Sequence, residues 1–508
     1  MFSARYTLAV ARRALLSVSD KTGLLPLAEA LRDLGFEILS TGGTMKALKD
    51  AGIPVRGVDD VTGFPECFGG RVKTMHPMIM GGVLFRRDNK DDMTQAKELK
   101  IEPIDLVCVN LYPFAKTAAD KTKTKADVIE QIDIGGPTLL RSAAKNAKHV
   151  TVLCDPADYD RVIAELKTGD TTEETRSELA AKVFVHTAQY DMLIAQYFGM
   201  NAGIVLTGGQ KLRYGENPHQ WGEYYSTTSS TGDWGTLHQG KALSYLNILD
   251  ADGAWAAVCE FTEPTAVFVK HANPSGIASD KKIEEAFQRA YDADRLSAFG
   301  VIIALNRACS ADIAQRIIDQ KMFVEVIVAP EYEAGALEIL KQKPNIRVIT
   351  QTVNGAAKTQ YRSVKGGMLV QNADDRVVTE KDLKVVSKKQ PTKEQIADLL
   401  FAWTAVKYCK SNAIAFAKDR VTVGLGTGQT SRVDSTWIAA KRAGEKAKGA
   451  VMASDAFFPF PDSVEEAAKH GIVAIIQPGG SIRDEEVFKK ADELGLIMVT
   501  TGVRAFRH

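Results

Sequence analysis

A lysine and a histidine stand side by side where an apolar run ends, and such a pair could move protons. The run TAVFV at 265–269 leads directly into Lys270 and His271, and residues 273–276 (NPSG) predict a sharp turn. A nearby ammonium group favours neutral imidazole, because a second positive charge is disfavoured. Neutral imidazole is a usable base near pH 7, and the lysine could protonate a leaving group. The alternative is an exposed lysine beside a capping histidine.

Other polar groups of the second half suit phosphate and flat rings. Arg213 and Tyr214 stand in a turn before Asn-Pro, and a guanidinium there suits phosphate recognition. Residues 410–412 (KSN) precede the apolar run AIAFA, and residues 426–432 (GTGQTSR) lead into a helical pattern that could bind an anion. The aromatic residues within 454–462 (SDAFFPFPD) could line a pocket for a flat ring or form a small apolar core.

In the first half, small and polar residues follow the apolar runs. Residues 19–21 (SDK) follow the run at 14–18, and residues 41–44 (TGGT) follow the run at 36–39; a helical pattern comes after each. Small residues let backbone N–H groups face an anion, and a helix N-terminus adds positive potential. These loops could therefore bind a phosphate group. The alternative is that they are only turns and helix caps.

The loops that follow carry groups that could transfer protons. Two cations and a hydroxyl come just after Gly69-Gly70, a phenol follows the run at 105–110, and a carboxylate opens a helix that also contains a lysine. The residues are Arg71, Lys73, Thr74, Tyr112, Asp133 and Lys145. If they converge near one phosphate site, they could bind a nucleotide and move protons. A solvated basic loop is the alternative for residues 71–77.

The order of strand and helix patterns predicts how these groups are held. Residues 1–155 alternate short apolar runs with helical patterns, which predicts an α/β domain with a mostly parallel sheet. Residues 156–205 are polar and helical and predict a helical bridge. A second α/β region follows at 206–508. Within it, strand, polar loop and helix recur at 265–290 and 413–445, so we expect two similar subdomains, at about 206–390 and 391–508.

Composition argues against several other classes of protein. The net charge of +1 argues against broad capture of nucleic acid. The six cysteines form no CxxC pair, so their spacing fits neither a zinc ribbon nor a disulfide framework, and a reducing compartment is favoured. No apolar run approaches the roughly 18 residues of a membrane helix. The arginine-rich start at 1–13 suggests a transit peptide only weakly, because the first strand pattern follows closely; a cytoplasmic location is expected.

Many longer motifs occur in a fixed order and together carry a resemblance. They are LLSVSDKTGL, STGGT, GRVKTMHP, NLYPF, IDIGGPTLLRSAAKN, LRYGENPHQ, VKHANPSG, KSNAIA, GTGQTSRVDS, SDAFFPF and QPGGS. From about residue 14 to residue 508 the chain resembles the bifunctional AICAR transformylase/IMP cyclohydrolase family. The resemblance implies a methylglyoxal-synthase-like N-terminal domain and two cytidine-deaminase-like subdomains without catalytic zinc. It also implies a homodimer whose transformylase site spans the subunit interface.

The same resemblance implies two reactions. A formyl group passes from the co-substrate 10-formyltetrahydrofolate to the amine of AICAR, and the product FAICAR then closes to IMP with loss of water. The amine is conjugated to its ring, so it needs a base as it attacks, and the folate nitrogen needs a proton as it leaves. By resemblance, His271 is the base, Lys270 is the acid or carbonyl polariser, and Asn412 orients the groups. For ring closure, Lys145 would be the principal proton-transfer residue, helped by Lys73, Tyr112 and Asp133.

Resemblance also supplies the expected binding residues. AICAR would be held by Arg213, Tyr214, Asn247, Gly300, Glu325, Arg432 and Arg504. Folate would lie near Phe457, Asp462, Ser481 and Ile482. The nucleotide of the ring-closure site would lie among Ser19, Asp20, Lys21, Thr41, Gly42, Gly43, Thr44, Arg71, Thr74, Asn110 and Ile134.

Some positions depart from the family's usual pattern. Gly69 stands where Asp is expected, Met80 where His is expected and Glu325 where some members have Asp, and AFGV replaces AFGG. None of these positions is assigned to the chemistry itself. Two other classes of function compete with the bifunctional enzyme: a nucleotide-binding regulatory protein without turnover, and a zinc deaminase. The first would bind AICAR or IMP and form no product, and the second would contain metal.

Overall fold

The computed structural model describes residues 12–200, 203–227, 234–353 and 357–508. Most of the segment considered for a transit peptide, residues 1–11, lies outside these ranges. The chain divides into two compact units, residues 1–207 with 226–230, and residues 208–225 with 231–508. Within the described residues, no helix combines the length and apolar character needed to cross a membrane.

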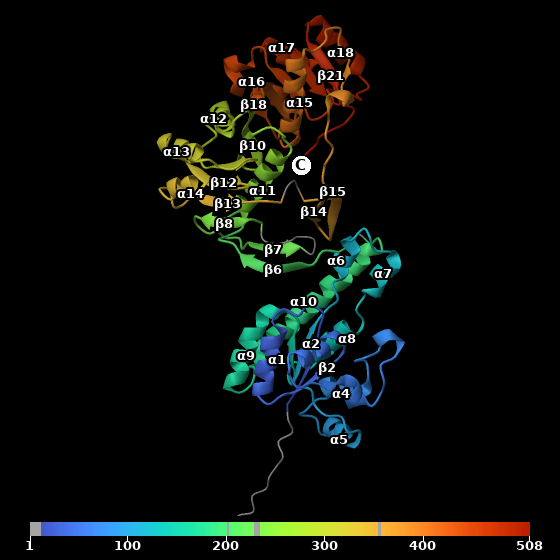
Figure 1. Cartoon of the computed structure of the whole chain (residues 1–508). Coiled ribbons are helices and arrows are strands. Elements are labelled where there is room, and N and C mark those ends of the chain that lie inside the picture. The colour runs from blue at the N-terminus through green and yellow to red at the C-terminus, as the bar shows by residue number, and fades with distance from the viewer. Residues whose placement is uncertain (1–11, 201–202, 228–233, 354–356) are drawn as a thin grey trace, which may run out of the picture. The chain divides into compact units, whose positions relative to one another are not determined.

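The first unit contains a five-stranded sheet in the order β3-β2-β1-β4-β5, and every neighbouring pair is parallel (Figure 1). Its strands are β1 (Arg13–Val18), β2 (Glu37–Ser40), β3 (Arg56–Gly57), β4 (Leu106–Asn110) and β5 (Thr151–Leu153). The parallel sheet predicted from the apolar runs is therefore present. No apolar run predicted β3, which is only two residues long. Since all strands run the same way, the loops after β1, β2 and β4 meet at one edge.

Ten helices surround this sheet in the part of the chain that the structure describes. They are α1 (Leu24–Asp33), α2 (Gly42–Asp50), α3 (Val58–Thr62), α4 (Pro77–Leu84), α5 (Lys90–Glu98), α6 (Phe114–Ala119), α7 (Lys125–Glu130), α8 (Gly135–Lys145), α9 (Tyr159–Thr168) and α10 (Glu173–Tyr197). Short 3₁₀ turns lie at η1 (Phe68–Gly70) and η2 (Pro156–Asp158). Leu179 and Val183 of α10 belong to the same apolar core as Leu15 and Val107. The segment expected as a bridge therefore packs on this domain, because α9 and α10 bury apolar side chains against it.

The second unit is built on a twelve-stranded sheet in the order β16-β21-β20-β19-β17-β18-β10-β9-β11-β12-β13-β8. Its strands are β8 (Thr236–Gln239), β9 (Thr265–Lys270), β10 (Asn273–Ser279), β11 (Val301–Leu305), β12 (Val324–Ala329), β13 (Arg347–Thr350), β16 (Lys384–Val385), β17 (Ile414–Lys418), β18 (Val421–Gly426), β19 (Val451–Ser454), β20 (Ala474–Gln477) and β21 (Ile497–Thr500). Two smaller sheets pair β6 (Leu206–Lys211) with β7 (Glu223–Thr227), and β14 (Thr359–Val364) with β15 (Gly367–Asn372).

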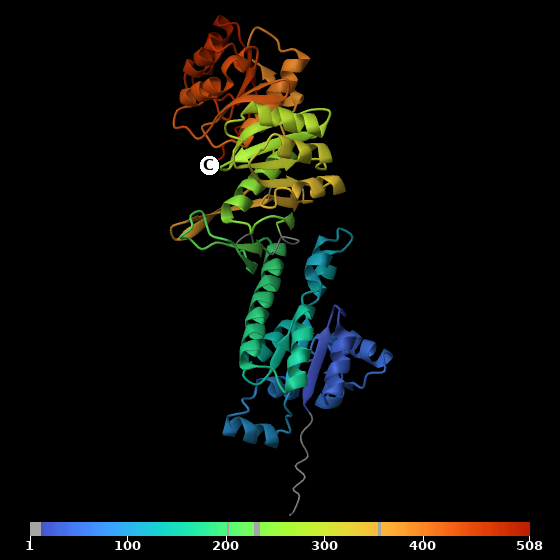
Figure 2. The same ribbon diagram turned by 90° about the vertical axis from the view of Figure 1, so that its left-hand side faces the viewer.

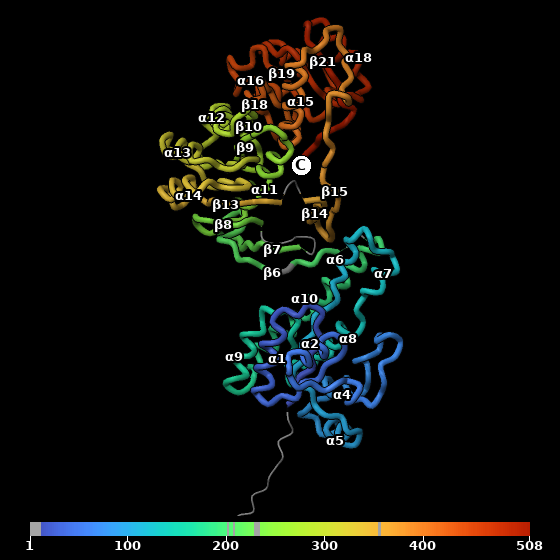
Figure 3. The backbone as a smooth tube through the Cα atoms, in the orientation of Figure 1, coloured from blue at the N-terminus to red at the C-terminus, as the bar shows by residue number. Residues whose placement is uncertain are grey.

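The large sheet consists of two halves with the same strand order, and they meet at β10 and β18. Each half starts with an antiparallel hairpin, β9–β10 or β17–β18, and continues outward through three strands that are parallel to one another. The central pair β10–β18 is antiparallel, so the halves run in opposite directions across the junction. In Figure 3 the first half runs from green to yellow and the second from orange to red. Residues 384–385 (β16), before the boundary expected at 390, lie in the second half of the sheet.

Helices cover both faces of this sheet. The first half contributes α11 (Tyr245–Cys259), α12 (Ile283–Ala293), α13 (Ala311–Asp319) and α14 (Ala334–Leu340). The second contributes α15 (Lys393–Lys407), α16 (Arg432–Ala443), α17 (Asp462–Lys469) and α18 (Asp484–Glu493), with 3₁₀ turns at η3 (Glu380–Asp382) and η4 (Gly444–Ala447). One core, under α11 and α15, extends through both halves, whereas the opposite face has a separate core in each half. The shared core joins the halves into one body.

Two equivalent glycines allow close packing on the divided face. An added Cβ at Gly276 in β10 would lie 2.1 Å from the carbonyl oxygen of Ala290 in α12. An added Cβ at Gly424 in β18 would lie 2.1 Å from the carbonyl oxygen of Ala439 in α16. No side chain fits at either place, so each helix can rest directly on the backbone of its hairpin.

Candidate active sites

The Lys270–His271 pair lies at a hairpin turn. Lys270 ends β9, Asn273 begins β10, and the two residues between them, His271 and Ala272, have φ angles of 59° and 57°. Two left-handed residues between paired strands are the mark of a type I′ turn, which matches the twist of the strands. Residues 273–276, predicted as the sharp turn, instead begin β10. Pro274 is tolerated there because the pairing with β9 shifts register beside it.

The Lys270 side chain is held on one side of this turn. Its ammonium group donates a 2.7 Å hydrogen bond to the carbonyl oxygen of Phe299, and Gly300, with a φ of 71°, follows at the start of β11. The His271 ring is exposed. The structure therefore places an ammonium group and an accessible imidazole together at one edge of the sheet.

The second half of the sheet brings Asn412 to the same edge. Asn273, beside the turn, accepts a 2.9 Å hydrogen bond from the backbone N–H of Lys410. Asn412 donates from its amide to the carbonyl oxygens of Gln429 and Thr430, at 2.9 and 3.1 Å. The junction of the two halves thus joins the Lys270–His271 turn to the segment that precedes β17.

Arg432 lies inside the protein and orients Asn412. Its guanidinium donates to the Asn412 Oδ1 at 2.7 Å and to the Ser454 hydroxyl at 2.9 Å, and it pairs with Asp455. Arg432 is 8% exposed and Asp455 is fully buried. The guanidinium is therefore engaged by internal partners, and its expected contact with AICAR stays a prediction. Asp455 was not singled out, because a lone aspartate after a strand gives no signal for a distant partner.

The remaining expected AICAR residues lie in the same unit. The Arg213 guanidinium stacks on the Tyr214 ring at 4.6 Å, and the Arg213 N–H donates to the carbonyl oxygen of Leu243, just before α11. Asn247, in the first turn of α11, is buried and accepts hydrogen bonds from Ser244 in a capping box. The structure thus gives Asn247 a role in capping the N-terminus of α11.

Glu325 and Arg504 complete this set. The pairing of β11 with β12 skips Glu325, and such bulges redirect a side chain. Its carboxylate pairs with Arg347 at 2.6 Å. Arg504 is exposed and stacks on Phe506, and the next residue, Ala505, donates its N–H to the carbonyl oxygen of Asp455 at 2.9 Å. The C-terminal segment is therefore bound to the end of β19.

The expected folate residues follow the ends of β19 and β20, at the edge that carries Asn412. Phe457 is 39% exposed and Ile482 is fully exposed. Asp462 begins α17, and the Ser481 hydroxyl accepts the N–H of Arg483 at 3.2 Å. Two of these positions therefore expose apolar side chains, and Asp462 adds a carboxylate.

In the first unit, three loops form a cradle at the carboxyl edge of the sheet. Asn110, the last residue of β4, accepts the N–H groups of Ser19 and Asp20 and donates its amide to the carbonyl oxygen of Asp20 at 2.9 Å. The Thr44 hydroxyl bonds both backbone groups of Val18, and the Lys21 ammonium lies 3.3 Å from the same hydroxyl. Partial burial lowers the pKa of Lys21, against the opposing effect of Asp20. The cradle comprises Ser19, Asp20, Lys21, Thr41, Gly42, Gly43, Thr44 and Asn110.

The start of α8 brings further candidates to this cradle. The Lys73 ammonium would lie 3.4 Å from a Cβ added at Gly42, and the Thr74 hydroxyl 3.2 Å from one added at Gly135. The Asp133 carboxylate accepts the N–H of Gly136 at 2.7 Å. Burial raises the pKa of Asp133, although the N–H groups of Gly136 and Tyr112 act in the opposite direction.

Other residues near α8 are more exposed. Tyr112 and Ile134 are 49% and 58% exposed, and the exposed Arg71 pairs with Glu130. Tyr190 of α10, which no sequence motif indicated, accepts the N–H of Asp133 at 2.8 Å and donates to the carbonyl oxygen of Gln131. Tyr190 therefore fixes the backbone that leads into α8.

Within one chain, Lys145 lies far from the candidates at the start of α8. It is the exposed last residue of α8, whereas Asp133 precedes the first residue, Gly135. A helix rises about 1.5 Å per residue, so the two ends of α8 are roughly 15 Å apart. Asn146 donates to the carbonyl oxygens of Val83 and Phe85 and fixes this far end against the end of α4.

The two departures in this region are accommodated by the structure. Gly69, within η1, has a φ of 62°, a left-handed value that glycine adopts without strain. Met80 in α4 packs partly buried against the apolar core. Neither residue removes a group of the cradle.

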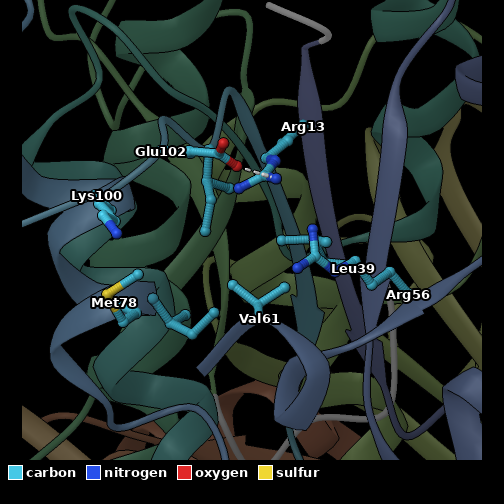
Figure 4. Close-up of a pocket in the computed structure, with 9 residues that line it drawn as sticks. Arg13, Leu39, Arg56, Val61, Met78, Lys100 and Glu102 are labelled. Carbon is cyan, nitrogen blue, oxygen red and sulfur yellow. Dashed lines mark ion pairs between the residues drawn. The ribbon is translucent and has the colours of Figure 1, made fainter. Parts of the chain in front are cut away.

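A cavity of about 160 Å³ lies at the opposite, amino edge of the first sheet (Figure 4). Arg13, at the start of β1, pairs there with Glu37 and Glu102, and Arg56 pairs with Glu37. Both arginines are thus paired with acids, so this part of the cavity is a structural ion-pair cluster. No group of three or more metal-ligating side chains occurs among the residues that the structure describes.

The two units carry two different sites. One has a cradle at the edge of a parallel sheet that suits a phosphate group, and the other has a lysine–histidine turn. Together these are features of a two-site enzyme for nucleotides. The MGS-like domain family matches residues 23–138, and the AICARFT/IMPCHase bienzyme family matches residues 143–442. The chain belongs to the AICARFT/IMPCHase bienzyme family. This confirms the resemblance and the methylglyoxal-synthase-like N-terminal domain.

Known relatives match the chain along its length. Proteins named bifunctional purine biosynthesis protein PurH from Bacillus cereus (strain B4264) and Bacillus mycoides (strain KBAB4) are each 51% identical over 512 residues. Each match covers 98% of this chain and all of the relative. A solved structure described as the crystal structure of ForH is 39% identical and covers 37% of this chain and all of that one, with a TM-score of 0.34.

Proposed function

We propose that this chain forms FAICAR from AICAR in its second unit and closes FAICAR to IMP in its first. The two activities, AICAR formyltransferase and IMP cyclohydrolase, are those of its family. The observation that supports the division of labour is the meeting of Lys270, His271 and Asn412 at one edge of the large sheet. The cradle around Asn110 lies in the other unit.

A folate-type donor follows from the formyltransferase activity, and we infer that it is 10-formyltetrahydrofolate. The exposed side chains of Phe457 and Ile482 lie at the edge that carries Asn412, and Asp462 adds a carboxylate. An apolar surface beside a carboxylate suits a flat ring with amino and amide groups. Bound there, the donor would supply the formyl carbon.

The turn can perform both proton transfers of the first reaction. His271 takes the proton of the AICAR amine as this nitrogen forms its bond to the formyl carbon. Lys270 polarises the carbonyl group and gives a proton to the folate nitrogen as the old carbon–nitrogen bond breaks. The products are FAICAR and tetrahydrofolate. Asn412, held by Arg432, orients the reacting groups.

Ring closure needs an amide nitrogen to attack the formyl carbon, followed by loss of water. Lys73, Tyr112 and Asp133 lie near the cradle and are the proposed proton-transfer groups. Lys145 lies at the far end of α8, so we infer that it serves this reaction only when a second chain presents it. This arrangement requires the homodimer that we propose.

A homodimer also accounts for an exposed ribbon in the second unit. In Figure 2, β14 and β15 stand apart from the large sheet, and every residue of both strands is exposed. The ribbon carries Met368, Leu369 and Val370, and an isolated two-stranded ribbon is only marginally stable in water. Contact with a second chain would cover these side chains. All six cysteines are free thiols, which supports the cytoplasm as the proposed location.

The direct test is product formation by the purified full-length protein. With AICAR and 10-formyltetrahydrofolate it should form IMP, and with FAICAR alone it should form IMP without the folate. Binding of AICAR or IMP with neither FAICAR nor IMP formed would favour a regulatory protein instead. Deamination of a nucleoside, together with stoichiometric zinc in metal analysis, would favour a deaminase.

A further inference from the structure

A buried carboxylate supports the catalytic turn from behind. Asp250, on α11, is 8% exposed and accepts the N–H of Ala272 at 2.7 Å. The N–H of His271 also interacts with this carboxylate, while burial raises the pKa of Asp250. The Asp250 carboxylate thus accepts hydrogen bonds from the backbone N–H groups of both turn residues.

The second half of the sheet repeats this arrangement without the histidine. The turn between β17 and β18 is formed by Asp419 and Arg420, with φ angles of 51° and 57°. Asp398, on α15, accepts the N–H of Asp419 at 2.9 Å and that of Arg420 at 2.8 Å. The correspondence includes the lysine before the turn, because Lys418 donates to the carbonyl oxygen of Lys448 at 3.0 Å, as Lys270 does to Phe299.

The carboxylate is needed because both turn residues adopt an unfavourable backbone. Left-handed φ angles are costly for residues other than glycine, at about 1–3 kcal/mol each, and persist only where the surroundings enforce them. In the first half, Asp250 enforces them beside a reactive side chain. In the second half, Asp398 does the same for a turn formed by Asp419 and Arg420, where no imidazole is present.

We propose that Asp250 is a positioning residue for formyl transfer, which holds the His271 imidazole in its reactive place by fixing the turn; this inference rests on the proposed function. Asp250 does not touch the substrate in this account. The titratable groups that face it are the imidazole of His271 and, from the second half of the sheet, the side chain of Lys410. The equivalent Asp398 supports a turn without a base and provides a matched control.

The test compares alanine and asparagine at both positions in the full-length protein. A displacement of about 1 Å can cost about 100-fold in rate, so Asp250→Ala should lower kcat for formyl transfer by about that factor. KM for AICAR should change by less than about threefold, because no substrate contact is lost. Asp250→Asn keeps one acceptor oxygen and should lower kcat by only about three- to tenfold relative to the wild type. Asp398→Ala should leave formyl transfer within about twofold, although it should lower the melting temperature.

Each outcome decides between the inference and its alternatives. Equal losses of kcat in Asp250→Ala and Asp398→Ala would show a general structural role and overturn the proposal, as would an Asp250→Ala enzyme with wild-type kcat. If Asp250→Ala does not fold, Asp250→Asn decides: a kcat unchanged within twofold would overturn the proposal, and a reduced kcat with unchanged KM and melting temperature would support it. Wild-type protein without formyl transfer would instead overturn the proposed function.

Discussion

Asp455→Ala should destabilise the second unit and stop formyl transfer. The Asp455 side chain is fully buried, pairs with Arg432, and accepts a 2.6 Å hydrogen bond from the Ser411 hydroxyl. Removing one partner of a buried ion pair leaves an uncompensated charge, which costs about 3–5 kcal/mol. The change also frees the guanidinium that orients Asn412 at 2.7 Å, so the loss of activity should exceed the loss of folded protein.

The protein contains a convenient probe for this measurement. All five tryptophans lie in the second unit, so tryptophan fluorescence during urea unfolding reports on that unit alone. Asp455→Ala should move this transition to lower urea by an amount that corresponds to about 3–5 kcal/mol. Ring closure of supplied FAICAR should continue, because its candidate residues lie in the first unit.

Two further variants separate stability from activity. The double variant Arg432→Met with Asp455→Leu replaces the pair by apolar groups and should recover most of the lost stability while formyl transfer stays absent. Glu486→Ala removes an exposed ion pair with Arg483 in the same half and should leave the transition and both activities unchanged. An Asp455→Ala transition displaced by less than about 1 kcal/mol would refute the reasoning, because the pair would then lack the cost of a buried charge. Wild-type formyl transfer in the double variant would refute the role of the guanidinium.

The remaining predictions use the two reactions as controls for each other. His271→Ala should abolish formyl transfer and spare cyclisation of FAICAR in a product assay, whereas Lys145→Ala should do the opposite; either variant silencing both reactions while folded would contradict two separate sites. Since Lys145 is proposed to act from a second chain, mixing Lys145→Ala with Asp133→Asn, a variant at the other end of α8, should restore some cyclisation, and no restoration would place Lys145 elsewhere. Burial raises the pKa of Asp133, so this carboxyl group loses its proton at higher pH than usual, and cyclisation should rise with pH through that window; a pH–rate profile unchanged in Asp133→Asn would exclude it as the base. Gly276→Ala places a methyl group 2.1 Å from a backbone oxygen of α12 and should lower the urea midpoint, whereas Gly367→Ala, with open space around it, should not.

Apolar runs identified most strands because buried strands need continuous apolar side chains. The runs at 14–18 and 265–269 correspond to β1 and β9. β10 was missed because residues 273–276 are typical of turns, and only its pairing with β9 and β18 makes them a strand. In such cases tertiary contacts outweigh local preference.

The site residues also divide into those that a local sequence pattern reveals and those that only tertiary contacts reveal. Lys270 and His271 could be selected because two reactive side chains are adjacent in sequence. Asp250 and Asp455 act through partners that are distant in the chain, so no local pattern reveals them. The separation of Lys145 from Asp133 follows from helix geometry once α8 is known to be unbroken.

The repeated halves of the large sheet bear on the ancestry of the protein. An antiparallel central pair such as β10–β18 is what a two-fold axis between identical subunits would produce, because each strand then meets its own copy. A gene for one half would have yielded a symmetric assembly with the same turn on both margins. Fusion of two such genes would have allowed the copies to diverge, which accounts for Asp419 at the turn position that His271 holds in the other half. The large sheet of each polypeptide is consequently asymmetric. One edge carries the turn with the reactive lysine and histidine, and the opposite edge carries a turn that needs only to fold.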